Sequence, residues 1–83
     1  CITNPMSQQE WDVLVDFSYW FGGYGTCKTD VVKYINQGKY YDSCAAYLKY
    51  RRAAGKDCSI RENKCRGVWL RAQERNVTCL AAQ

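Results

Sequence analysis

Acidic side chains are the first candidates for chemistry in this 83-residue sequence, because carboxyl groups can act as general acids and bases. Hydrolysis of a glycosidic bond, for example, uses one protonated and one ionised carboxyl group across a cleft. The acidic residues are Glu10, Asp12, Asp16, Asp30, Asp42, Asp57, Glu62 and Glu74. Asp57 and Glu62 fall in a polar stretch and could flank a ligand, but nothing in the sequence buries either of them.

Other acidic residues have simpler structural interpretations. Glu10 stands at the spacing of a helix N-terminal capping box. Asp12 and Asp16 are one helical turn apart, which places both on the solvated side of the same helix. Glu74 is within reach of Arg71 for an ion pair along a later helix. We therefore predict no catalytic carboxylate pair within this chain.

Nucleophilic, nucleotide and metal chemistry are also disfavoured. The chain has no histidine, so a serine or cysteine nucleophile would lack its usual base. The glycines at positions 22, 23 and 25 follow a predicted helix rather than a strand, which is not the context of a nucleotide-binding loop. We expect neither a metal ion nor an organic cofactor.

The cysteines predict covalent cross-links. They are Cys1, Cys27, Cys44, Cys58, Cys65 and Cys79. An even number in a short chain indicates a disulfide framework and an oxidising compartment. Zinc is the alternative, but no two cysteines have the spacing of a zinc knuckle.

The sequence does not determine the disulfide pairing. We predict Cys58–Cys65, which would close a short polar loop. We further predict Cys27–Cys44, which would join neighbouring helices, and Cys1–Cys79, which would join the two ends.

Aromatic residues provide candidates for a binding surface, with three Trp, seven Tyr and two Phe in the chain. Tyr19 and Trp20 stand beside a glycine-rich stretch, and Tyr50 is followed by Arg51 and Arg52. Aromatic faces can stack on sugar rings, while arginine can donate hydrogen bonds to sugar oxygens. The same mixture would suit single-stranded nucleic acid. Trp20 and Tyr50 lie near helix ends, where a core role and a surface role are equally open.

The chain is moderately basic, with a formal net charge of +4. Its Lys and Arg residues gather between Lys49 and Arg75. Outside the cytosol such a protein would meet anionic polymers or phospholipid head groups, although a basic surface can also simply maintain solubility. No apolar run reaches membrane-spanning length and no signal peptide is present. Because the chain starts at Cys1, we expect a mature product or a piece of a longer protein.

The apolar pattern predicts an all-α fold that begins with an extended lead-in over residues 1–6. The first helix would start after Ser7 and end at Gly22. Its expected core face consists of Trp11, Leu14, Val15, Ser18 and Phe21. We also expect Phe17 in the core.

Three more helices follow from the apolar spacing and from the glycines that end them. They cover residues 29–37, 40–54 and 66–80. The charged segment 56–64 would be a loop with room for one helical turn. We therefore predict one domain over residues 1–83, a small bundle of about four helices stapled by disulfides.

Four segments, taken in order and spacing, resemble the C-terminal lobe of the phage-type lysozymes, which are endolysin-like muramidases. The first runs from Ser7 to Gly22 and is polar, then aromatic. The second is Thr29–Val32 with the helix stop Asn36–Gly38. The third, residues 47–56, is aromatic and then basic with a glycine, and the fourth, residues 67–74, carries an arginine and a glutamate. Together they cover nearly the whole chain.

The sequence departs from that family at two points. Trp20 stands where the family has a cleft amide, and the last segment lacks one of two arginines. The catalytic glutamate and its partners belong to an N-terminal part of the family fold that this chain does not resemble. The resemblance implies that Tyr19, Trp20, Tyr50 and Arg52 line the far wall of the cleft and that Arg71 braces it.

Three functions follow as hypotheses. The first is the peptidoglycan-binding lobe of a bacteriolytic muramidase that hydrolyses the β-1,4 bond between N-acetylmuramic acid and N-acetylglucosamine. The second is a non-catalytic module that binds cell wall or a partner protein. The third is a small cationic toxin acting on membranes, although its helices lack the required segregation of basic and apolar faces. Whether this chain is itself an enzyme stays open.

The first hypothesis sets the expected partners and location. Peptidoglycan would be the substrate, and an N-terminal segment or a second chain would supply the catalytic acid. An inhibitor or immunity protein is a further candidate partner, whereas nucleic acid and stable membrane insertion are not expected. The site of action would be extracellular or periplasmic, for an endolysin or an antibacterial toxin.

Overall fold

Helices dominate the computed structural model, which describes all 83 residues. Helix α1 (Gln8–Phe21) leads directly into the single turn α2 (Gly23–Thr26), and α3 (Asp30–Asn36) follows. Helix α4 (Tyr40–Ala46) ends in the 3-10 turn η1 (Tyr47–Lys49). Strands β1 (Arg52–Ala53) and β2 (Lys56–Asp57), the 3-10 turn η2 (Arg61–Asn63) and α5 (Arg66–Ala81) complete the chain.

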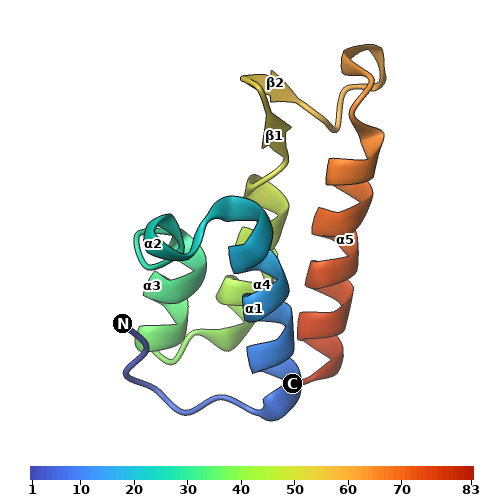
Figure 1. The fold of residues 1–83 in the computed structure, drawn as a ribbon. Coiled ribbons are helices and arrows are strands. Elements are labelled where there is room, and N and C mark those ends of the chain that lie inside the picture. Colours follow the sequence, from blue (N-terminus) through green and yellow to red (C-terminus); the bar gives the residue numbers. More distant parts are fainter.

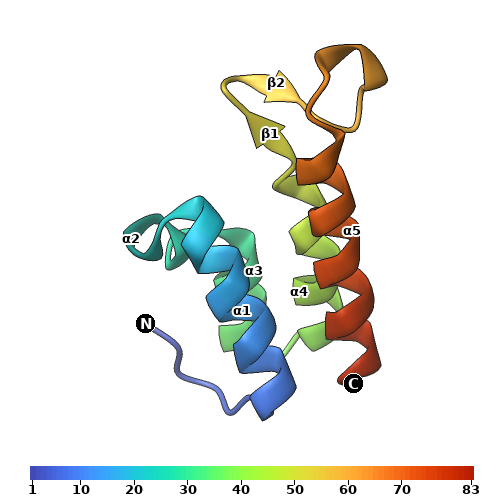
Figure 2. The same cartoon turned by 45° about the vertical axis from the view of Figure 1, so that its right-hand side comes forward.

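The helices pack around one core, and the hairpin projects from it (Figure 1). Helix α3 packs on α4, and α5 packs on α1, α4 and η1. Figure 2 shows that β1, β2 and the following loop extend beyond the helices, next to the N-terminal end of α5. The predicted all-helical, disulfide-stapled class is confirmed, apart from this small hairpin.

The predicted start of α1 is confirmed. The Glu10 backbone N–H donates to Ser7 Oγ at 3.2 Å, and the Ser7 N–H donates to Glu10 Oε1 at 2.9 Å. These reciprocal bonds satisfy two N–H groups at the helix end. The helix ends where Gly22 adopts a φ of 105°, a conformation that residues with a side chain rarely adopt.

The buried face of α1 differs from the predicted one. Leu14 and Phe17 are buried as expected, and Val13 joins them. Trp11 is 39% exposed, Phe21 40% and Val15 47%, so these three face partly outward. Helix α1 is apolar on two neighbouring stripes. The stripe that faces Tyr47 and α5 is the buried one, and only tertiary packing makes that choice.

The third predicted helix, over residues 40–54, is wrong in its second half. Helix α4 stops at Ala46, η1 continues to Lys49, and the chain then turns into an antiparallel hairpin that pairs Arg52 with Asp57 and Ala53 with Lys56. Ala54 and Gly55 form the turn with φ values of 51° and 79°. Two consecutive residues with positive φ are typical of a two-residue hairpin turn, because the backbone twist of such a turn matches the right-handed twist of the two strands that it joins.

The structure confirms one predicted disulfide and corrects two. Cys58–Cys65 forms as expected. The predicted Cys27–Cys44 and Cys1–Cys79 pairs are wrong, because the bonds are Cys1–Cys27 and Cys44–Cys79. Cys44 and Cys79 are both buried where α4 packs on α5.

The N-terminal lead-in explains the remaining pairing. The Asn36 amide holds this segment on α3, since its Oδ1 accepts from the Thr3 N–H at 2.8 Å and its Nδ2 donates to the Cys1 carbonyl at 2.9 Å. Cys1 is therefore held near α3 and the turn before it, within reach of Cys27, at a Cα–Cα distance of 5.9 Å.

Candidate functional site

An open groove of about 470 Å³ lies where the end of α1 meets the chain between η1 and β1. Its lining residues are Trp20, Phe21, Lys49, Tyr50 and Arg52. Three residues predicted from the sequence, Trp20, Tyr50 and Arg52, therefore come together from segments about thirty residues apart. No acidic side chain lines this groove.

A cluster of aromatic rings supports the groove from below. The ring of Phe17 is fully buried and lies 5.3 Å from the rings of Phe21, Tyr47 and Tyr50, measured between centroids. The Trp20 ring is 6.1 Å from it. The Phe17–Phe21 pair is stacked and the other three contacts are tilted or edge-to-face, and aromatic pairs of both kinds are favourable and directional. Phe17 thus fixes the side chains that form the groove floor.

Tyr50 is also held at its hydroxyl end. Its oxygen accepts a hydrogen bond from the Asp30 backbone N–H at 3.0 Å, at the start of α3. The Asp30 carboxylate in turn pairs with Lys49 Nζ at 3.2 Å, and this hydrogen bond raises the pKa of the lysine. Both groups are exposed, so the pair orients Lys49 more than it stabilises the fold. Arg52 takes part in no ion pair and keeps its charge available to a ligand.

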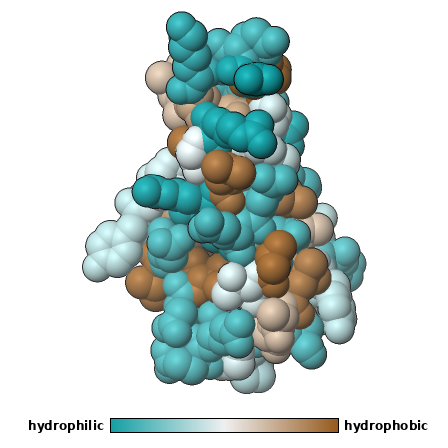
Figure 3. All heavy atoms as spheres, turned by 90° about the vertical axis from the view of Figure 1, so that its right-hand side faces the viewer, coloured by the Kyte–Doolittle hydropathy of each residue, from teal (hydrophilic) through white to brown (hydrophobic).

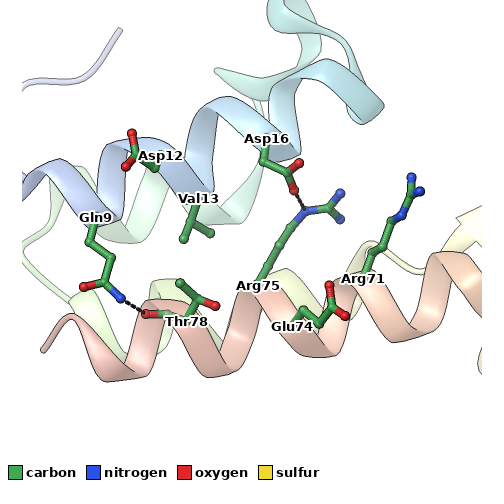
Figure 4. A pocket seen from close by; sticks show the side chains of 8 residues that line it. All are labelled: Gln9, Asp12, Val13, Asp16, Arg71, Glu74, Arg75 and Thr78. Carbon is green, nitrogen blue, oxygen red and sulfur yellow. Dashed lines mark hydrogen bonds and ion pairs between the residues drawn. The ribbon is translucent and has the colours of Figure 1, made fainter.

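The structure separates two predicted site residues from this groove. Tyr19 is 88% exposed and is not among its lining residues. Arg71 lines a second groove, of about 380 Å³, between α1 and α5 (Figure 4). The lining of this second groove is Gln9, Asp12, Val13, Asp16, Arg71, Glu74, Arg75 and Thr78.

Arg75 is the notable residue that the sequence reasoning missed. It is only 5% exposed, and its Nε donates to Asp16 Oδ2 at 2.8 Å. Its guanidinium carbon lies 5.7 Å from the Phe17 ring and 5.4 Å from the Trp20 ring. Arg75 therefore lies between the two grooves. The buried face of α5, which Ala72 and Cys79 share with Arg75 at helical spacing, was the available signal.

Two acidic residues, Glu74 and Asp16, differ from their predicted roles. The expected ion pair between Arg71 and Glu74 does not form. The ion pairs of the chain are Lys49–Asp30, Arg51–Asp57 and Arg75–Asp16. Asp16 is thus not only a solvated surface group. Asp12 accepts from Gln8 Nε2 at 2.9 Å, within the same helix.

Asp57 is the centre of a polar network in the projecting segment. Its Oδ1 accepts from the Ser59 hydroxyl at 2.6 Å and from the Ser59 N–H at 2.9 Å. Arg51 Nε donates to the same oxygen at 3.1 Å. These interactions lower the pKa of Asp57 to about 2, with the Ser59 hydrogen bonds the main cause. Asp57 is therefore a structural carboxylate rather than a proton donor.

The network should be sensitive to acid. The pKa of Asp57 lies below its ordinary value of 3.8, so the ionised carboxylate stabilises the fold fully at a pH above 3.8. This contribution is lost as the pH falls toward 2. We expect the hairpin amides to lose hydrogen-exchange protection over that range before the helices do. In Asp57→Asn this acid-dependent loss should disappear, with lower protection already at neutral pH. Equal loss in hairpin and helices would contradict this.

No group of three or more His, Cys, Asp or Glu residues is arranged to hold a metal ion. None of the helices has the length and apolar composition needed to span a bilayer.

Comparison with known proteins supplies the family. The model of the family described as phage lysozyme matches residues 1–74. Neither the curated proteins nor the solved structures include a significant match. The match covers α1 to α4, the first turns of α5 and the whole groove of Trp20, Tyr50 and Arg52. Of the residues that line the second groove, Arg75 and Thr78 lie beyond it. The chain therefore belongs to the phage lysozyme family, which indicates a lysozyme-type function directed at peptidoglycan.

Proposed function

We propose that this chain forms the glycan-binding lobe of a muramidase that hydrolyses the β-1,4 bond between N-acetylmuramic acid and N-acetylglucosamine. The observation that carries the proposal is the groove of Trp20, Tyr50 and Arg52, beside Lys49. Residues 1–83 act as one domain in this proposal. The catalytic acid is carried by a different segment or by a second chain.

The groove has the chemistry that an amino-sugar polymer requires. Trp20 and Tyr50 offer ring faces for stacking on the apolar face of a sugar. Lys49 and Arg52 can donate hydrogen bonds to acetamido oxygens and can pair with the lactyl carboxylate of N-acetylmuramic acid. Since no carboxylate lines the groove, it binds and orients a glycan without acid–base chemistry of its own.

The groove between α1 and α5 gives a role to Arg71. Arg71 and Arg75 lie one turn apart on α5 and both line this groove, and the two terminal nitrogens of Arg75 donate no hydrogen bond within the chain (Figure 4). In our proposal the catalytic segment lies against this groove and Arg71 braces it, while Arg75 stays paired with Asp16. Tyr19, fully outside both grooves, would contribute only at the edge of a long glycan.

The compartment follows from the same chemistry. Three disulfides and a cell-wall substrate suggest an extracellular or periplasmic location. We propose secretion and an antibacterial role, as an endolysin or as a toxin with an inhibitor or immunity partner.

Binding to purified peptidoglycan tests the groove. We expect Trp20→Ala to weaken sedimentation with peptidoglycan by about tenfold, equivalent to roughly 1.4 kcal/mol. Tyr19→Ala is the comparison, since it removes a neighbouring aromatic ring outside the groove and should weaken sedimentation clearly less than Trp20→Ala does. Circular dichroism would verify that both variants fold. Equal weakening by the two substitutions, or none by Trp20→Ala, would refute the groove as the binding site.

Release of reducing sugars tests the catalytic part of the proposal. The 83-residue chain alone should bind peptidoglycan without cleaving it, and cleavage should appear when the chain is joined to its natural upstream sequence. Binding with no cleavage in either form would instead support a non-catalytic wall-binding module. Leakage of lipid vesicles would support the membrane-active alternative.

A further inference from the structure

The segment that projects from the helices is strongly basic. Between Arg52 and Arg66 there are five Lys or Arg residues and two acidic residues, a formal charge of +3 out of +4 for the whole chain. Four of these cations stand apart from the glycan groove, namely Lys56, Arg61, Lys64 and Arg66, and we call them the basic tip. All four are exposed.

The acidic residues nearby do not neutralise the basic tip. Asp57 is already paired with Arg51 and Ser59, and none of the four cations takes part in an ion pair. Glu62 is the only other acidic residue in the segment, and the first turn of α5 contains none. The tip therefore presents uncompensated positive charge to solvent.

The tip is held in one shape by several independent links. The Cys58–Cys65 disulfide closes the loop, and Asn63 Nδ2 donates to the Asp57 carbonyl at 2.6 Å. The Cys58 N–H donates to the Arg51 carbonyl at 2.8 Å, which ties the loop back to the hairpin. A preorganised charged surface loses little conformational entropy when it binds.

The side chains around the basic tip indicate which class of polyanion it can bind. No aromatic residue occurs between Arg51 and Val68, so the tip lacks the stacking platform that single-stranded nucleic acid uses. Ile60, 48% exposed, is its only large exposed apolar side chain, too little for insertion into a lipid interface. Figure 3 shows the corresponding end of the molecule covered mostly by hydrophilic side chains. Recognition there has to be electrostatic.

We propose that the basic tip binds a phosphodiester-containing polymer attached to the bacterial cell wall. Repeated phosphates provide a polyanion, and Lys and Arg bind phosphate oxygens as point charges and as forked donors respectively. This inference shares the cell-wall location with the proposed function but not the groove. The tip would hold the protein on the wall while the groove engages glycan.

Poly(glycerol phosphate) is the probe for this proposal. We expect Arg61→Gln/Lys64→Gln to weaken binding of the free polymer by about tenfold at low salt and to flatten the dependence of affinity on salt, because fewer counterions are released. The control is Lys33→Gln/Lys39→Gln, which removes the same charge from two exposed lysines near α3 and should change affinity less than about twofold. The charge-preserving Arg61→Lys/Lys64→Arg should bind like the unmodified chain.

Cell walls with and without the polymer distinguish this site from the groove. Treatment with hydrofluoric acid removes phosphodiester polymers and leaves the glycan. The tip variant should bind untreated walls less well than the unmodified chain does and treated walls equally well, whereas Trp20→Ala should weaken binding to both. Equal effects of the tip and Lys33/Lys39 variants, no binding of the polymer, or tighter binding to anionic lipid vesicles than to the polymer would each overturn the proposal.

Discussion

Replacing both Cys44 and Cys79 with alanine is expected to lower the free energy of unfolding by about 4 kcal/mol. The two residues are separated by 35 positions, so their cross-link removes a large share of the conformational freedom of the unfolded chain. Both side chains are also buried, at 0% and 5% exposure, where α4 packs on α5. Urea denaturation of the oxidised proteins would measure the difference.

The Cys58→Ala/Cys65→Ala variant is the matched control. Its loop spans only 7 positions, so the same relation gives roughly 2 kcal/mol. Cys58 is buried, but neither cysteine of this pair belongs to the core cluster, so the variant should keep the packing of α1, α4 and α5. If both double variants unfold at the same urea concentration, the Cys44–Cys79 link is not the main covalent support of the core.

Helix ends could be predicted from the sequence where a capping residue or a glycine marks them. Ser7 and Glu10 form the predicted capping box, and Gly22 ends α1 with a backbone angle that favours glycine. Helix α3 lies within the predicted residues 29–37, and Gly38 follows it with a φ of 75°. Each of these features depends on residues within a few positions of one another.

Features that depend on distant partners were not predictable in the same way. The disulfide pairing required knowing that α4 packs on α5 and that Asn36 holds the N-terminal lead-in. The hairpin has strands of two residues, which are too short to show alternation of apolar and polar side chains. Gly55 by itself is equally typical of a helix end, which is what the sequence predicts there.

The candidate site shows the same division. The resemblance to phage-type lysozymes predicts that Trp20, Tyr50 and Arg52 line one cleft, and in the structure these three residues line one groove. It also grouped Tyr19 and Arg71 with them, whereas Tyr19 lies outside the groove and Arg71 belongs to the groove on the other side of Arg75. An arginine on the buried face of a helix is rarely expected from sequence, because only its ion pair with Asp16 and its stacking on two rings make that burial favourable.

Phe17 connects the stability of the fold to the proposed binding groove. Its ring is fully buried and contacts the rings of Trp20, Phe21, Tyr47 and Tyr50. We expect Phe17→Ala to lower the free energy of unfolding by about 3–5 kcal/mol, since the cavity adds to the lost burial. Under conditions where the variant remains folded, peptidoglycan binding should also weaken, because Trp20 and Tyr50 lose the surface that orients them.

Phe21→Ala is the comparison for this prediction, because it deletes an identical ring that is 40% exposed and lies in the same stack. Its expected effect on the free energy of unfolding is smaller, roughly 1–2 kcal/mol, since less apolar area returns to water. Urea denaturation and peptidoglycan sedimentation would be measured on both variants. A folded Phe17→Ala protein with unchanged binding would show that the groove is positioned without the buried ring, leaving Tyr50 held by its hydrogen bond from Asp30.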